Sequence, residues 1–323
     1  EEFQAIQNGT YKTAVSTRST DRGLNCVTGA IEGNYLVAQK NHVNGYFMND
    51  SRAEGVMGTE GDFETMIKMI EEAGGISHIN HPGDWLSSAG DESIARDPGN
   101  VQFFADLLLR YPSCLGIEVY NAFDRPTSND RVLWDELLQV VIPQGRNVWG
   151  FGNNDAHNLN DIDTCFMDFV MPEFSQANVR TTMENGAFFA VSRYEDGERI
   201  GDTGAYPMVT CILVDEEADT ITIVGKNCDK INWIADGEII QTNTKGAGNV
   251  VSSTIKLRSH SDDISCYVRA ELEGTGGKTL TQAFVCDDGN MDDQIDIGSP
   301  VTTVVKSFVD MLLDILKKIL FLA

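Results

Sequence analysis

The feature that most constrains the fold is a change in pattern near residue 204. Before it, over residues 24 to 190, short apolar runs alternate with amphipathic stretches. The apolar runs cover 26–32, 42–47, 75–80, 115–120, 147–152 and 165–171, and the amphipathic stretches cover 61–74, 100–112, 128–145 and 175–186. Strands that alternate with helices are typical of parallel βαβ units, because a parallel strand pair needs a long crossover. This part of the chain is therefore expected to form an α/β sheet or barrel.

The first amphipathic stretch shows the helical pattern most clearly. Phe63, Met66, Ile67 and Ile70 recur at spacings of three and four residues, which places them on one face of a helix. A Gly pair at 74–75 is a typical helix end. Residues 61–74 are therefore predicted to be a helix that packs one apolar face on the sheet.

Beyond Gly204, residues 207–286 read as about seven short strands separated by turn residues. Alternating residues such as Tyr267, Arg269 and Glu271 indicate half-buried antiparallel strands. Strands of this number and length are typical of a small β-sandwich. The expected domains are 1–203 for the α/β part, 204–286 for the sandwich and 287–323 for a tail.

The tail joins an acidic linker at 286–300 to an apolar stretch at 301–323. In this stretch Lys306, Asp310, Asp314, Lys317 and Lys318 keep roughly to one helical face. Charges within the stretch argue against a membrane-spanning helix. An amphipathic helix of this kind can lie in a membrane interface, dock on a partner or fold back on its own chain.

The charge balance limits the class of partner. The chain carries 49 acidic and 24 basic residues, for a net charge of −25. Such a surface repels phosphate backbones, so general nucleic-acid binding is disfavoured and no nucleic-acid partner is expected. A small phosphorylated substrate is still compatible if local cations cancel the repulsion.

The seven cysteines show neither a Cys-x-x-Cys pair nor a framework spacing. Their odd number favours reduced thiols. Four of them nevertheless fall in one region and could pair if oxidised: Cys211, Cys228, Cys266 and Cys286.

Scarce chemistry-bearing residues fall at the ends of the expected strands. In parallel α/β folds, the carboxyl ends of strands converge on one opening, where functional side chains gather. Glu32 and His81 end apolar runs, Glu118 falls late in one, His42 opens one, and Asp155 and His157 directly follow another. In an extended segment, Asp155 and His157 point the same way and can hold one ion together.

Several of these residues have a second interpretation. His78 precedes His81 by three residues, so in a strand it faces the other way and is expected to be structural or to support a ligand. Glu118 is either a ligand, an acceptor that supports a ligand, or an ion-pair partner of Arg125, and the supporting role is favoured. Asp155 can also cap the segment that follows it. His260 is expected on the surface.

Mixed imidazole and carboxylate ligands suit zinc, manganese or iron. A bound divalent ion lowers the pKa of its water to around 7, and two ions can clamp the attacking and leaving oxygens of an ester hydrolysis. The pattern therefore favours metal-dependent hydrolysis.

Five stretches, "TGAIEGN", "NHVNGYF", "GISHINHPGDW", "LGIEVYN" and "WGFGNNDAHN", resemble motifs of the polymerase-and-histidinol-phosphatase (PHP) superfamily. The resemblance covers about residues 20–192. The β-rich part is similar to the C-terminal sandwich of the branch that includes carbaryl-hydrolase-like metallohydrolases. The resemblance implies a distorted (β/α)7 barrel that holds two or three divalent ions and hydrolyses phosphoesters. It also implies that Glu32, His42, His81, Asp155 and His157 are ligands, and that Glu118 and Asn121 line the pocket.

One departure from the family pattern concerns its first motifs. The family opens with a His-x-His pair, whereas no His precedes His42 in this chain. We expect that the first two βα units are missing through truncation, rather than that the chain is a degenerate member. As given, the chain keeps about half of the expected ligand set.

The leading expectation is thus a metal-dependent phosphoesterase acting on a small phosphorylated or ester substrate. One alternative is an amide or carbamate hydrolase of the same fold, and another is an inactive, surface-attached binding or scaffold protein. Residues 301–323 could provide peripheral membrane or oligomer contact. The compartment is not fixed by the sequence; an extracytoplasmic or membrane-associated location is slightly favoured over the cytoplasm.

Overall fold

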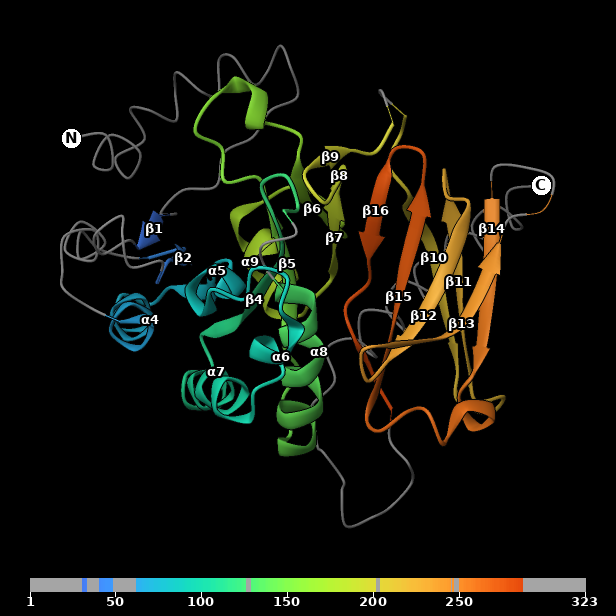
Figure 1. The fold of residues 1–323 in the computed structure, drawn as a ribbon, viewed down its shortest axis with the longest axis horizontal. Helices are drawn as coiled ribbons and strands as arrows, with labels where there is room; N and C mark the ends of the chain where they lie inside the picture. Colours follow the sequence, from blue (N-terminus) through green and yellow to red (C-terminus); the bar gives the residue numbers. More distant parts are fainter. Residues whose placement is uncertain are drawn as a thin grey trace, which may run out of the picture.

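A computed structural model describes residues 31–33, 41–48, 62–125, 129–201, 204–244, 246 and 250–286 (Figure 1). For residues 31–33 it gives the backbone alone. The expected linker and amphipathic helix at 287–323 lie outside the described residues. So does the side chain of Glu32.

The first sheet has five strands in the order β1-β2-β3-β4-β5. They are β1 (Ile31–Gly33), β2 (Val43–Tyr46), β3 (Ile76–Ile79), β4 (Cys114–Asn121) and β5 (Trp149–Asn153). The pairs β1–β2 and β2–β3 are antiparallel, whereas β3–β4 and β4–β5 are parallel. The carboxyl ends of β3, β4 and β5 therefore lie along one edge, beside the start of β2.

Six helices accompany these strands in the described chain. They are α4 (Phe63–Glu72), α5 (Pro82–Leu86), α6 (Glu92–Ala95), α7 (Pro98–Arg110), α8 (Asp130–Val141) and α9 (Gln176–Glu184). Side-chain caps fix where several of them begin: Asp62 accepts a hydrogen bond from the Thr65 N–H, and Asp97 accepts from Gly99 and Asn100. Short 3-10 turns lie at Ile142–Gln144, Leu159–Asp161 and Leu257–His260.

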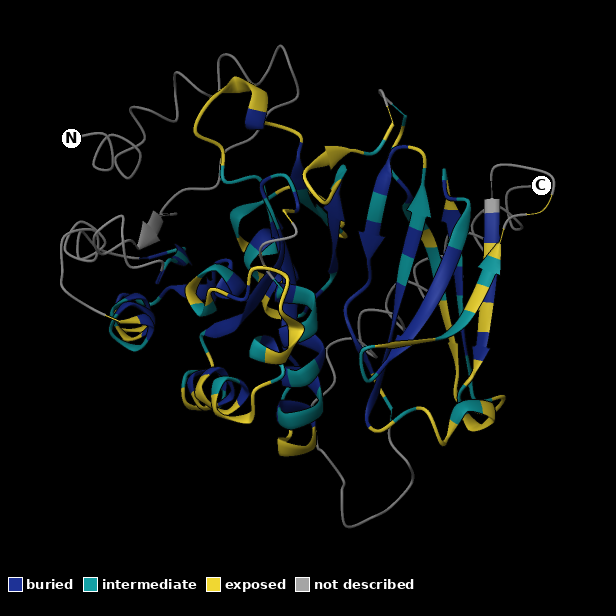
Figure 2. Cartoon of the chain, viewed as in Figure 1, coloured by how far each residue is buried: buried dark blue, intermediate teal, exposed yellow. Residues whose placement is uncertain are grey.

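Apolar residues cover both faces of the five-stranded sheet. On one face, α4, α7 and α8 contribute Phe63, Phe104 and Trp134 to a core that includes Ile79 and Ile117. On the other, a smaller cluster joins Trp149 and Phe151 of β5 to residues of α9 and β7. Figure 2 shows buried central strands and exposed outer sides of α4 and α7. The sheet is therefore an interior layer whose edge carries the polar residues.

The remaining strands are antiparallel. They are β6 (Cys165–Phe169), β7 (Phe188–Ser192), β8 (Tyr194–Glu195), β9 (Glu198–Arg199), β10 (Met208–Asp215), β11 (Thr220–Lys226), β12 (Lys230–Ala235), β13 (Glu238–Thr244), β14 (Val250–Lys256), β15 (Tyr267–Gly274), β16 (Gly277–Leu280) and β17 (Phe284–Val285). One sheet runs β13-β12-β15-β16-β7-β6 with β17 on β15, and another runs β10-β11-β14. Trp233, Ile223 and Leu272 fill the core between these two sheets.

The expected (β/α)7 barrel is wrong. The five-stranded sheet includes antiparallel pairs, and among the described strands β6 does not continue it. Instead β6 pairs antiparallel with β7, and β7 pairs with β16 through Ser192 and Lys278. Alternation of apolar runs and helices indicates that strands exist, but it carries no information on their direction or partner, and here β16 supplies the partner from outside the alternating region.

A buried ion pair joins the two parts of the chain. Asp135 on α8 accepts two hydrogen bonds from Arg269 on β15, both at 2.7 Å, and one from the Tyr267 hydroxyl at 2.8 Å. The Arg269 side chain is 4% exposed and its guanidinium lies over the Trp134 ring. This contact makes β15 part of the support for α8.

Candidate functional site

The turn at His81 lies where β3 meets α5. Pro82 occupies the first position of this helix, where its missing N–H costs nothing. His81 has φ 27° and ψ 59°, in the left-handed region that non-glycine residues rarely adopt, and it is 7% exposed. Its backbone N–H donates to Glu118 Oε2 at 2.7 Å. A buried carboxyl group thus holds His81 in an uncommon conformation.

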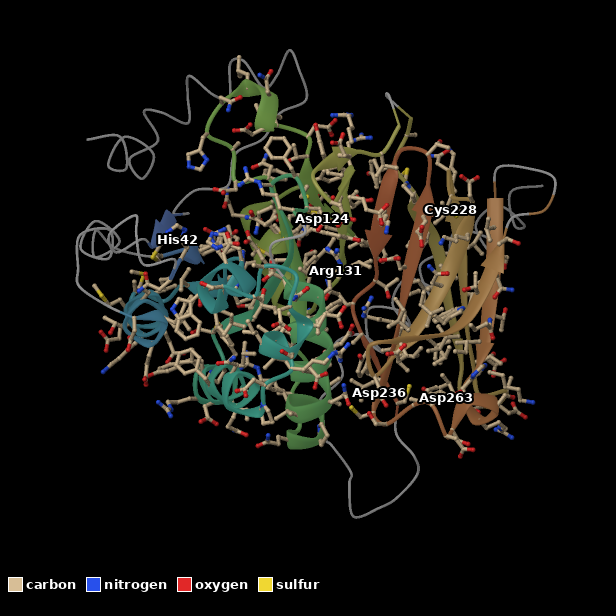
Figure 3. The ribbon with its side chains drawn as sticks, viewed as in Figure 1. His42, Asp124, Arg131, Cys228, Asp236 and Asp263 are labelled. Atoms are coloured by element: carbon tan, nitrogen blue, oxygen red, sulfur yellow. The ribbon has the colours of Figure 1, made fainter. Side chains whose placement is uncertain are left out.

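His42 faces His81 across the antiparallel β2–β3 pair. The Asn80 N–H donates to the carbonyl of His42 at 3.0 Å, which brings the two segments together. His42 Nδ1 then lies 3.2 Å from His81 Nε2, and the rings meet edge to face with centroids 4.9 Å apart. His42 is labelled in Figure 3, next to α5. Two of the sequence-predicted ligands are therefore brought together.

Glu118 is the centre of the hydrogen bonding at this edge. Besides His81, its carboxyl oxygens accept from the Asn153 side chain at 2.5 Å and from the Asn121 side chain at 3.1 Å. Burial raises the pKa of Glu118 well above its usual value, and the charges of Asp130 and Asp155 raise it further. Arg125, the other expected partner of Glu118, lies near the Phe123 ring instead.

His78 is buried inside the sheet, in a stack of rings. Its ring lies 4.1 Å from Phe151 and 5.7 Å from Tyr46, measured between centroids. His78 Nε2 is 2.9 Å from the Asn153 side-chain nitrogen and 3.4 Å from that of Asn44. Asn153 therefore connects His78 to Glu118.

Asp155 and His157 follow β5, which ends at Asn153. Asp155 has φ 46°, so the extended backbone that would make the two side chains parallel is absent. The His157 side chain is 80% exposed, and its Nδ1 is 2.8 Å from the Asp155 backbone oxygen. Asp155 is close enough to Glu118 to affect its pKa, whereas His157 points to its own loop.

The fifth expected ligand, Glu32, is described only through its backbone. It pairs with Asn44 in the β1–β2 ladder. Because Asn44 contacts His78, this pairing places the Glu32 backbone one strand away from the ring stack.

Two residues of the site were missed by reasoning from the sequence. Asn153 ends β5, so the rule about strand ends applied to it but was used only for charged residues and His. Asp130, the first residue of α8, accepts from the Gly83 N–H at 2.6 Å, and no local pattern identifies that contact. Both hold the backbone or the carboxyl group that supports His81.

The fit to a metal ion is partial. His42 and His81 present facing imidazole nitrogens, and Asp155 acts at this edge through its effect on the pKa of Glu118. In the described chain, however, no three side chains of His, Cys, Asp or Glu are gathered closely enough to form a complete ion site. The described residues thus bring two imidazoles together, without a full coordination shell.

Comparison of the chain with protein-family models, with curated proteins and with solved structures finds no match. Among the helices of the described residues, none has the length and apolar character needed to cross a membrane.

Proposed function

We propose that this protein is a metal-dependent hydrolase of small phosphoesters, and that His42 and His81 hold a divalent ion. The observation that carries the proposal is the 3.2 Å separation of His42 Nδ1 and His81 Nε2. Two nitrogens at about 2.1 Å from one zinc ion and at this separation subtend roughly 100° at the ion, near the tetrahedral angle. Metal analysis distinguishes a shared ion from a direct hydrogen bond between the two rings, which has a similar length.

The surroundings of the pair support a site rather than a chance contact. His81 has a φ of 27°, and the buried Glu118 carboxyl group holds its backbone N–H at 2.7 Å. Uncommon backbone conformations of this kind cluster at functional sites, where surrounding contacts hold them. Asp155 is proposed to move in as a third ligand when the ion binds, and Glu118 positions His81 through its backbone N–H.

A divalent ion bound there supplies a Lewis acid and a water of lowered pKa. The chain's own residues orient that centre: Asn153 and Asn121 donate to Glu118, and Glu118 fixes the turn that presents the His81 ring. The site lies at the carboxyl edge of β3, β4 and β5, where ligands of open α/β sheets bind.

The ion is tested by elemental analysis after dialysis of the chain against zinc and manganese. We expect bound metal in the wild type and an affinity at least about tenfold weaker in His42→Ala and in His81→Ala, since each loses a ligand. His260→Ala, the same change in the sandwich, is the matched control and keeps its metal. A wild-type chain without metal, or equal metal in all four proteins, contradicts the proposal.

Turnover is tested with p-nitrophenyl phosphate, beside a p-nitrophenyl ester and a carbamate. We expect cleavage of the phosphate that a chelator abolishes and that zinc or manganese restores. Faster cleavage of the carbamate would replace the phosphoesterase assignment by carbamate hydrolysis. Metal binding with no turnover of any of the three would replace it by a binding function.

A further inference from the structure

We infer that Cys266 and Cys286 form a reversible disulfide across the β15–β17 ladder when the chain meets a thiol oxidant. Both are free thiols in the structure. This modification site is separate from the histidine pair and does not depend on the proposed function.

The register of the two strands places these cysteines opposite each other. Tyr267 pairs with Val285 and Val268 pairs with Phe284, in antiparallel orientation. One step further along the ladder, Cys266 faces Cys286, and the Cys286 N–H donates to the Cys266 carbonyl at 2.8 Å. Residues that face each other as a hydrogen-bonded antiparallel pair have Cα atoms about 5.5 Å apart, within the range that a disulfide spans.

Among the described cysteines this juxtaposition is specific. The ladders place Cys211 opposite Val224 and Cys165 opposite Ser192. Cys228 is buried in the core between the sandwich sheets. Among the described residues, Cys266 and Cys286 are thus the two cysteines that lie opposite each other in paired strands.

In the reduced chain the two thiols have separate acceptors. Cys266 Sγ lies 3.7 Å from the Leu138 carbonyl of α8, and Cys286 Sγ lies 3.7 Å from the Phe284 carbonyl. Bond formation therefore requires both side chains to rotate. The ladder permits this because β17 contains two residues and Val285 is exposed, so the strand can open locally.

The environment makes the reaction slow at neutral pH. Burial, with a smaller effect of Asp236, raises the pKa of Cys266 to about 11. Burial, followed by the electrostatic effect of Cys266, raises the pKa of Cys286 to about 12. Asp236 is labelled in Figure 3 and accepts from Ser265, the residue before Cys266, at 2.6 Å. Because the thiolate is the attacking species, oxidation accelerates as pH rises.

A small disulfide such as oxidised glutathione supplies the oxidising equivalents. The Cys286 thiolate attacks one of its sulfurs and releases one glutathione thiolate. The Cys266 thiolate then attacks the Cys286 sulfur of the mixed disulfide and releases the second. One disulfide is broken and one is formed, and the two protons lost by the cysteines go to the two released glutathione thiolates.

The test is peptide mapping of the full chain after incubation with oxidised glutathione at pH 8.5 and at pH 6.5, followed by alkylation and trypsin. We expect peptide 259–269 linked to peptide 279–306, at a higher rate at pH 8.5, and lost after dithiothreitol. Cys211→Ser is the matched control and keeps the linkage, whereas Cys266→Ser and Cys286→Ser abolish it.

A second readout is the thermal midpoint, which we expect to rise by about 3 °C or more on oxidation of the wild type and not of Cys286→Ser. Alkylation of both cysteines after full incubation overturns the inference. So does recovery of Cys266 or Cys286 linked mainly to glutathione or to another cysteine.

Discussion

At the scale of single residues, the site depends on a buried carboxyl group that holds a backbone. Glu118 accepts from the His81 N–H, and Asn153 contacts both Glu118 and His78. The His81 ring can face His42 only while this chain of contacts keeps the turn in its left-handed conformation. The residues that support the histidines therefore matter as much as the histidines themselves.

Replacing Asn153 by Ala is expected to destabilise the fold by about 1–3 kcal/mol, because the buried Glu118 oxygen and the His78 ring both lose their partner. Urea denaturation measures the change. Asn160→Ala, at an exposed position, is the matched control and should lie within about 0.5 kcal/mol of the wild type. Equal midpoints for the two variants would show that the Asn153 contacts do not stabilise this edge.

His157→Ala tests whether His157 binds the ion, as the family resemblance implies, or stays outside the site, as its exposed position indicates. The side chain is 80% exposed and turned to its own loop, so we expect metal affinity within about twofold of the wild type. Isothermal titration with zinc measures it. A loss as large as that of His81→Ala would mean that His157 is a ligand and that its loop rearranges around the ion.

Part of this site could be predicted from the sequence, for a physical reason. His81 was found because the carboxyl ends of strands converge, and that rule depends only on where strands end. His42 precedes the start of β2 and lies beside His81 because β2 is antiparallel to β3, which the expected parallel arrangement did not include. The Asp155–His157 geometry could not be obtained in this way, because it depends on a positive φ angle in a loop. The contact between Asp130 and Gly83 joins two helix starts far apart in sequence, which no local pattern indicates.

At the scale of elements, a half-buried carboxyl group on strand β6 makes the stability of the fold depend on pH. Asp168 is half-buried on this strand and accepts from the Tyr206 hydroxyl at 3.2 Å. Burial raises the pKa of Asp168 above its usual value of 3.8. The folded state therefore holds the proton more tightly than the unfolded state, and the stability this provides is lost as pH rises through the folded-state pKa.

Asp168→Asn should remove this pH dependence while keeping an acceptor for Tyr206. We expect the free energy of unfolding of the variant, relative to the wild type, to increase as pH rises from 3.5 through the range just above 3.8, and then to level off. Denaturation at a series of pH values measures the difference. Asp262→Asn, at an exposed position, is the control, and a flat difference for Asp168→Asn would contradict the pKa assignment.

The elements themselves follow from the pattern more closely than their pairing does. Helix α4 and strand β3 lie within the stretches that periodicity selected, and β4 and β5 overlap theirs, with β4 extending one residue beyond at each end and β5 one residue beyond at its carboxyl end. Periodicity reflects which face is buried, and that is a local property. The antiparallel β6–β7 pair, by contrast, depends on β16, a strand about 90 residues away, so the expected barrel failed at that point.

At the scale of the whole molecule, a buried ion pair connects helix α8 of the α/β part to strand β15 of the antiparallel sheet. Asp135 accepts from Arg269 and from Tyr267, and the Asp135 and Arg269 side chains are 5% and 4% exposed. Since α8 also covers the five-stranded sheet, this contact links the sandwich to the layer that carries the site.

Asp135→Ala is expected to destabilise the protein by about 3–5 kcal/mol, because it leaves the Arg269 guanidinium buried without its counter-charge. Combining Asp135→Leu with Arg269→Met should recover most of that loss, since it removes both charges and keeps the volume. Denaturant unfolding of the single and double variants measures this. A single-variant loss below about 1 kcal/mol would show that water reaches the guanidinium.

The most direct test of the account is X-ray absorption spectroscopy of the zinc-loaded chain, because it counts the imidazoles bound to the ion. We expect two imidazole nitrogens at about 2.0–2.1 Å from the zinc ion in the wild type, and one in His42→Ala and in His81→Ala. A wild-type spectrum without imidazole scattering, or one that neither substitution changes, would contradict a shared ion between His42 and His81.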